Sequence, residues 1–327
     1  SFSGQGNTPQ LKTKAQQDIE RIGGLIPAEL QPDYQLFTGQ GGDPNKYNVQ
    51  ERMSALRQSQ LDDLNLKTQQ AEYNKLTAPP TPESANPLDA AISNSDRTAD
   101  YVKRDQYRHP KETLTFFGIK PSMSVIELWP SRGWYSEILE AFLRNEGTFF
   151  AADFDPNYAA WTPKAIKRNA DNRAKSKILS EMKMITLFID EKPLYDKESV
   201  DMVLTFRNLH NWLKAGLLMD VFNKSYAVLK PGGIFGVVEH RALPGTSIED
   251  MNKSGYVTEK LAIEYAEKAG FVLIATSEIN ANPKDGTIHP KGVWTLPPSL
   301  RLGDEDKEKY IAIGESDRMT LKFIKPE

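Results

Sequence analysis

The sequence predicts an α/β fold, with a mostly parallel sheet and helices on both faces, from about residue 96 to residue 327. Short apolar runs alternate there with segments in which apolar residues recur at helical spacing. The stretch 125–139 indicates a strand, a tight loop and a helix in direct succession, because Pro130 and Gly133 separate an apolar run from a helical pattern. Polar residues collect where the expected strands end. This combination is typical of parallel sheets that bind ligands at their carboxyl ends.

The first 95 residues differ in composition from the rest of the 327-residue chain. They are rich in Gln, Asn, Pro and Gly, and all five Trp residues lie beyond them. We therefore expect an N-terminal arm and linker over 1–95, with one amphipathic helix within 49–76, and one packed domain over 96–327. The arm is either a tail with one helix packed on the domain, or a segment that contacts another subunit or a partner protein.

Charge and composition exclude several classes of protein. A net charge of −3 gives no electrostatic footprint for nucleic acid, and no apolar run approaches the ~18 residues of a transmembrane segment. The lack of cysteine excludes disulfides, thiolate metal sites and cysteine nucleophiles. No set of His, Asp and Glu residues has metal-ligand spacing, so no metal is expected. The small polar opening at Ser1 fits a removed export signal, which favours a periplasmic location with or without a lipid anchor; the cytoplasm is the alternative.

The elements of the domain follow from local patterns. In the first half we expect a helical segment over 96–118, a strand over 125–128 with its loop 129–133 and helix, a strand over 148–152, a polar helix over 163–180 and a strand over 184–189. In the second half we expect a strand over 200–206, a helix over 213–229, a turn over 230–233, strands over 234–239 and 271–276, a helix over 258–269, an irregular insert over 281–316 and a closing strand over 318–325. Thr258 is expected to cap the helix that follows it, and Gly270 to end it.

Non-structural polar residues fall at the expected carboxyl ends of the strands, where open parallel sheets bind their ligands. They are Glu127, Asp153 and Asp155, Asp190, 207–212, 239–241 and 278–282. An acid after the second strand, about twenty residues past the first loop, is where a pair of ribose hydroxyls would be held, and we favour Asp153 over Asp155. No nucleophile-elbow or P-loop pattern is present.

At this point the chain resembles a known family. Val-Ile-Glu-Leu from residue 125, the acid after the second strand, Asp201 at the start of the fourth strand and Leu-Lys-Pro-Gly-Gly from 229 are together similar to class I S-adenosylmethionine-dependent methyltransferases. Four longer motifs are more closely similar to a group of bacterial predicted methyltransferases, many of them exported. These motifs are Glu-Leu-Trp-Pro-x-x-Gly-Trp-Tyr from 127, Phe-Arg-Asn-x-His-Asn-Trp from 206, Gly-Val-Trp-Thr-Leu-Pro-Pro from 292 and Arg-Met-Thr-Leu-Lys-Phe from 318. The resemblance covers about 97–326.

The resemblance implies a Rossmann-like, seven-stranded sheet in the order 3-2-1-4-5-7-6, with the last strand antiparallel, and S-adenosylmethionine as cofactor. It implies cofactor-binding roles for Glu127, Trp129, Ser131, Arg132, Gly133, Asp153, Asp190 and Asn208. Among these, the loop would flank the methionine part, Asp153 would hold the ribose and Asp190 would lie near the adenine. The segment 207–212 would line the transfer site. His210 and His240 are the candidates for a base, since histidine titrates near neutrality, and Arg207 could bind an acidic acceptor.

The loop departs from the family pattern, which has three glycines after the acid. Trp129 and Ser131 occupy two of those places and only Gly133 remains. Glycine allows close approach of the backbone and positive φ, so the substitutions weaken the expected cofactor site unless Arg132 pairs with the cofactor's carboxylate. Two functions follow: methyl transfer to a small, unidentified acceptor, or a catalytically inactive methyltransferase-like subunit that its arm anchors in an assembly. A nicotinamide dehydrogenase is disfavoured because G-x-G-x-x-G is absent.

Overall fold

The structure is a computed structural model that describes residues 86–327. The expected arm, its helix within 49–76 and most of the Pro-rich linker lie outside the described residues, and the division at residue 96 stays a prediction. Within 86–327, no helix is both long enough and apolar enough to span a bilayer.

Within the described part of the chain, the sheet has seven strands in the order β3-β2-β1-β4-β5-β7-β6. They are β1 (Ser124–Leu128), β2 (Thr148–Phe154), β3 (Lys183–Leu187), β4 (Val200–Phe206), β5 (Leu229–His240), β6 (Val272–Ser277) and β7 (Arg318–Ile324). β7 runs antiparallel to β5 and β6, and the other pairs are parallel. This order and the reversed last strand confirm the predicted Rossmann-like methyltransferase fold.

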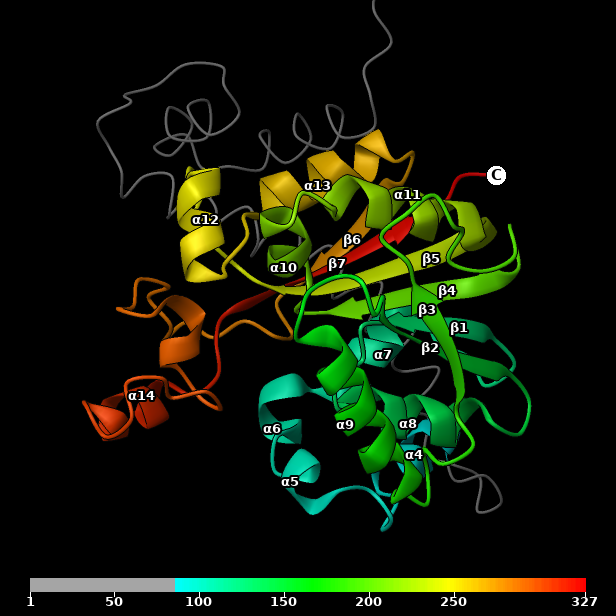
Figure 1. Cartoon of the computed structure of the whole chain (residues 1–327), viewed down its shortest axis with the longest axis horizontal. Coiled ribbons are helices and arrows are strands. Elements are labelled where there is room, and N and C mark those ends of the chain that lie inside the picture. The colour runs from blue at the N-terminus through cyan, green and yellow to red at the C-terminus, as the bar shows by residue number, and fades with distance from the viewer. Residues whose placement is uncertain (1–85) are drawn as a thin grey trace, which may run out of the picture. The chain divides into compact units, whose positions relative to one another are not determined.

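Helices cover both faces of this sheet (Figure 1). The principal ones are α4 (Pro87–Ile92), α7 (Pro110–Phe117) and α8 (Trp134–Leu143) on one face, and α10 (Leu209–Lys214), α11 (Leu218–Val228) and α13 (Glu259–Lys268) on the other. Two hydrophobic cores result. Phe222 of α11 and Ala266 of α13 belong to one, and Leu114 of α7 and Ile138 of α8 belong to the other.

The remaining described helices are short or lie at the edges: α5 (Ala99–Val102), α6 (Asp105–Arg108), α9 (Thr162–Ala174), α12 (Ile248–Ser254), the 3-10 turn η2 (Gly292–Thr295) and α14 (Lys307–Ile313). The predicted helical segment 96–118 is therefore three helices, because His109 takes a left-handed φ of 41° before Pro110 starts α7. Pro87, expected in a linker, is the first residue of α4.

Several local predictions are confirmed. The hydroxyl of Thr258 caps α13 by accepting from the backbone N–H of Leu261, and Gly270 follows the end of this helix with a φ of 103°. The turn expected over 230–233 instead lies inside β5, which begins at Leu229 and pairs with β4 across a register shift. The antiparallel β7 has one consequence for function. Its first residue, Arg318, pairs with His240, so the start of β7 lies at the edge where the parallel strands end.

Candidate functional site

The loop after β1 has the backbone of a glycine loop without its glycines. Trp129, Ser131 and Gly133 take left-handed φ angles of 46°, 54° and 87°. For the two non-glycine residues this conformation costs roughly 1–2 kcal/mol each. A Cβ at Gly133 would lie 2.9 Å from Leu179 Cδ1, the end of a side chain that can move away, so glycine is favoured at this position mainly by its φ.

The Trp129 side chain fills the space at the end of β1 and β2. Its ring is only 5% exposed, and its centroid lies 4.7 Å from that of Phe154, 4.9 Å from Tyr158 and 5.4 Å from Trp212. Trp161 packs on the outer side of Phe154 and Tyr158. We call these five residues the aromatic cluster. Inclined and edge-to-face rings at such distances pack favourably, so the aromatic cluster fills the space at the carboxyl ends of β1 and β2.

The acids expected to hold an adenosyl group are engaged elsewhere. The buried Asp153 carboxylate pairs with Arg173, with 3.2 Å between Oδ2 and Nη1. Asp155 accepts from the backbone N–H groups of Asn157 and Ile189 and so closes its own loop. Asp190 is exposed at the surface, where the backbone N–H and side chain of Lys192 lower its pKa.

The remaining cofactor candidates hold the loop in place. Burial raises the pKa of Glu127 to about 7, and its carboxyl group accepts from the Ser136 hydroxyl at 2.6 Å. The Asn208 side-chain amide donates to the Leu128 carbonyl at 3.0 Å, which ties the end of β4 to the end of β1. Arg132 is exposed, and its carbonyl accepts from the Tyr101 hydroxyl.

A small hollow of about 190 Å³ lies beside Trp129, between the end of β3 and helices α10 and α11. It is lined by Trp129, Leu187, Phe188, Ile189, Trp212, Leu217, Asp220 and Val221. Much of this volume is open to solvent, and the hollow encloses no space that could take a nucleoside with an amino-acid chain. The aromatic cluster fills the space that an adenosyl moiety would need, and Asp153, the acid expected to bind its ribose, is paired with Arg173. In this arrangement the residues present do not fit S-adenosylmethionine.

His210, Glu239 and His240 form a buried group over the ends of β4 and β5. The Glu239 carboxylate accepts from His210 Nδ1 at 3.1 Å and from the backbone N–H groups of His210 and His240 at 3.1 and 2.7 Å. This bond directs the proton of His210 to Nδ1 and leaves Nε2 as a lone-pair nitrogen. His240 Nδ1 contacts the Ser316 hydroxyl at 2.5 Å. Burial, followed by His210 and nearby arginines, lowers the pKa of His240 well below 6.5, so this imidazole is neutral.

The same three residues meet the distance requirement of a metal site, which their sequence spacing did not reveal. One ligand atom from each lies within 4.8 Å of the others. The Glu239 oxygens, however, already accept from three N–H groups. Arg207 and Arg318 are also close enough to His240 to lower its pKa. Their positive charges oppose a cation, so the group is better suited to acid–base chemistry or to binding an anion.

Arg207 follows β4 directly, in a left-handed conformation with a φ of 63°, and its N–H donates to the Val238 carbonyl at 2.7 Å. Within residues 86–327 its guanidinium makes no hydrogen bond and no ion pair. Desolvation of the guanidinium, followed by the positive charge of Arg318, lowers the pKa of Arg207 to about 10. Arg207, His210 and His240 thus meet above β4 and β5, whereas Asp153 lies at the end of β2, farther along the same edge.

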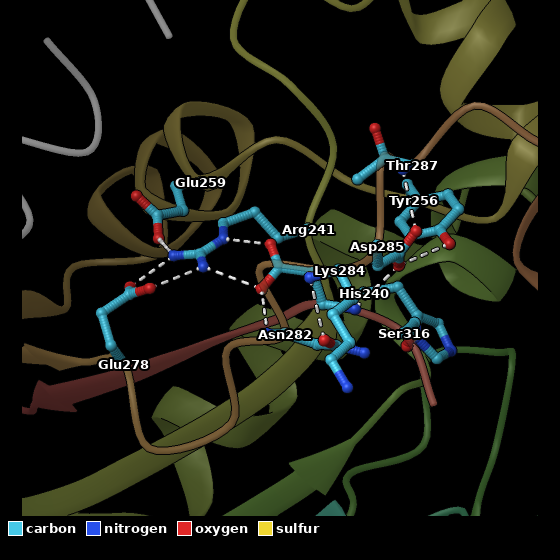
Figure 2. A network of polar contacts seen from close by, with 11 residues as sticks. His240, Arg241, Tyr256, Glu259, Glu278, Asn282, Lys284, Asp285, Thr287 and Ser316 are labelled. Carbon is cyan, nitrogen blue, oxygen red and sulfur yellow. Dashed lines mark hydrogen bonds and ion pairs between the residues drawn. The ribbon is translucent and has the colours of Figure 1, made fainter. Parts of the chain in front are cut away.

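Arg241 is the centre of a structural network (Figure 2). Its guanidinium pairs with Glu278 at 2.7 Å, Glu259 at 3.0 Å and Asp317 at 2.9 Å. Although burial opposes it, these three carboxylates raise the pKa of Arg241 above its ordinary value. The network ties β5, α13 and the segments beside β6 and β7 together.

Three buried residues near Arg207 and His240 were not among the predicted site residues. They are Arg108, Glu315 and Arg318. Because the last strand is reversed, its first residues lie at the carboxyl edge of the sheet. The charged segment 315–318 at the start of β7 was therefore the sequence feature that could have indicated these residues. Arg108, within the segment 96–118 predicted to be helical, is 3% exposed.

No protein-family model matches the chain, and no curated protein does. Among solved structures, it is similar to a SAM-dependent methyltransferase from Aquifex aeolicus, with 14% identity, a TM-score of 0.43, and coverage of 74% of this chain and 100% of the other. It is also similar to an arsenic(III) S-adenosylmethionine methyltransferase from Chlamydomonas reinhardtii, with 16% identity, a TM-score of 0.40, and coverage of 75% and 74%. A third is a TehB-like SAM-dependent methyltransferase from Corynebacterium glutamicum, with 11% identity, a TM-score of 0.41, and coverage of 69% and 96%. Similarities of this size say nothing about ligand or activity, and the sheet order remains the basis for the fold.

Proposed function

We propose that this chain is a methyltransferase-like subunit that does not use S-adenosylmethionine. The observation that supports this proposal is the aromatic cluster, in which Trp129 takes the space that a nucleoside would need beside Phe154 and Trp212. The ion pair between Asp153 and Arg173 supports it independently, because the carboxylate that was expected to hold a ribose is already paired. Residues 1–95 are proposed as the segment that attaches the chain to another subunit, and an exported location stays part of this proposal.

Methyl transfer to a small acceptor is the second candidate, and one observation favours it. The loop keeps left-handed φ at 129, 131 and 133, the three positions at which the family has glycine. In that case His210, oriented by Glu239 through Nδ1, would take the acceptor's proton at Nε2. Arg207 would orient an acidic acceptor, since its guanidinium is free of other partners in the described residues.

A calorimetric titration of the full chain with S-adenosylmethionine separates the two candidates. We expect no binding up to millimolar cofactor, because entry of the nucleoside requires the buried Trp129 ring to leave its three aromatic neighbours. We expect the Trp129→Gly variant to bind, since glycine both opens the space and relieves the left-handed φ at this position.

The matched control is Trp161→Gly, which removes the same side chain from the exposed outer side of the cluster. It should bind no better than the wild type. Micromolar binding by the wild-type chain would contradict the proposal and make methyl transfer the better description. A Trp129→Gly variant that binds no better than the control would show that Trp129 is not the obstacle.

A further inference from the structure

Three arginines converge on one carboxylate at the carboxyl edge of β4, β5 and β7, and a fourth arginine follows β4 at the same edge. Arg104 Nε lies 2.6 Å from Glu315 Oε1, Arg108 Nε lies 3.7 Å from Glu315 Oε2, and Arg318 Nη2 pairs closely with the same carboxylate. Arg207 follows Phe206, whose ring stacks on the ring of Tyr135, and the Tyr135 hydroxyl donates to the Arg108 carbonyl at 3.1 Å, so Arg207 and Arg108 lie at the same part of this edge. We call Arg104, Arg108, Arg207 and Arg318 the arginine cluster.

Within the described part of the chain, these guanidinium groups have more donors than there are acceptors beside them. Arg108 and Arg318 are each 3% exposed, and the Nε of each is buried without a hydrogen-bond partner, as is Nη2 of Arg104. Arg207 makes no hydrogen bond or ion pair within 86–327. Buried donors without acceptors are costly, and buried charges are normally paired. A fixed arrangement of this kind indicates that a ligand supplies the missing acceptors.

The carboxylates near the arginine cluster also carry too little negative charge to balance its four arginines. Glu315 is ionised, because its three arginine neighbours outweigh the effect of burial and hold its pKa well below 4.5. Glu127, which both Arg207 and Arg108 influence, has a pKa of about 7 and is only partly ionised at neutral pH. The next carboxylate, Glu239, already accepts from His210 and two backbone N–H groups. The four positive charges are therefore not balanced locally.

We propose that the arginine cluster is a binding site for a small oxyanion, a phosphate or a carboxylate-bearing compound, held between the guanidinium groups of Arg108 and Arg207. Planar guanidinium groups bind such anions through paired N–H donors. Arg104 and Arg207 are half-buried, so the ligand reaches the site from their side. His240 borders the site, and its neutral imidazole adds no charge to it. The site does not depend on the proposed function, because it involves neither the aromatic cluster nor Asp153.

The test is thermal unfolding and calorimetric titration of the full chain with inorganic phosphate and, separately, citrate, against chloride at equal ionic strength. At least one anion should raise the Tm of the wild type, and the stronger of the two identifies the class of ligand. In the Arg207→Gln variant the affinity should fall about ten- to a hundredfold, as expected for loss of a charged hydrogen-bond donor. Without anion, the same variant should unfold about 2–4 °C higher than the wild type, because it lacks an unpaired charge next to Arg108.

The control is Arg168→Gln on the exposed face of α9, which removes the same charge far from the arginine cluster. It should change neither the Tm without anion nor the affinity for phosphate or citrate. The proposal is overturned if neither anion stabilises the wild type relative to chloride. It is also overturned if Arg207→Gln binds the anion as tightly as the wild type does.

Discussion

Replacing Glu315 by Gln is expected to lower the free energy of unfolding by about 3–5 kcal/mol, the usual cost of breaking a buried ion pair. Glu315 is the carboxylate on which Arg104, Arg108 and Arg318 converge, and its side chain is 2% exposed. A neutral amide would leave three positive charges without this counterion, and two of them, Arg108 and Arg318, are buried. The measurement is urea-induced unfolding at pH 7, compared with the Glu308→Gln variant, which changes an exposed carboxylate on α14 and should be neutral.

The pH dependence of the same variant gives a second check. Burial alone would raise the pKa of Glu315, but the arginines outweigh it, so the folded-state pKa lies well below 4.5. A carboxyl group whose pKa is lower in the folded state stabilises the protein when the pH is above its pKa in the unfolded state. This stabilisation is lost as the pH falls toward the pKa in the folded state. The gap between wild type and Glu315→Gln should therefore be largest near neutrality and narrow below about pH 4.5. A gap that is small at pH 7 would show that Glu315 does not hold the arginine cluster.

Replacing Arg241 by Gln should be about as destabilising, again about 3–5 kcal/mol. In the wild type this guanidinium pairs with Glu278, Glu259 and Asp317, and without it three carboxylates face one another in a partly buried network (Figure 2). Burial already raises the pKa of Glu278 despite the arginine, so removal of the arginine should raise it further. The variant should therefore regain stability on acidification from pH 7 to pH 5, as the carboxylates take up protons.

Urea unfolding of Arg241→Gln at several pH values tests this expectation, with Arg168→Gln as the exposed control. Because Arg241 has no free donor left for a ligand, its loss should act on stability and leave binding of phosphate or citrate to the folded chain unchanged. A variant as stable as the wild type at pH 7 would contradict the structural role of the network.

The fold was largely predictable because its determinants are local or follow from one family pattern. Apolar runs such as 125–128 and 200–206 are buried on both sides and so mark their strands directly. Sequence patterns were less informative where the backbone departs from its ordinary range. His109 before Pro110 divides one expected helix into several, and the glycines at 232 and 233 lie inside β5 rather than in a turn before it.

The candidate site was only half predictable, for a physical reason. His210 and His240 could be placed at neighbouring strand ends from the strand order alone, and they lie with ring centroids 5.4 Å apart. What a side chain pairs with is a tertiary property, so the engagement of Asp153 by Arg173 could not be read from sequence. The substitution of glycine by Trp129 signalled a changed loop, but only its packing against Trp212 indicates that the space is filled.

The central claim is that the ligand-binding edge of the sheet is divided, with the β1–β3 end filled by the aromatic cluster and the β4–β7 end prepared for an anion. A crystal structure of the full chain grown with S-adenosylmethionine and inorganic phosphate tests it most directly. We expect Trp129 to remain packed against Phe154, Tyr158 and Trp212, with phosphate bound between Arg108 and Arg207. Density for a nucleoside beside Asp153, with Trp129 displaced from the cluster, would contradict the claim.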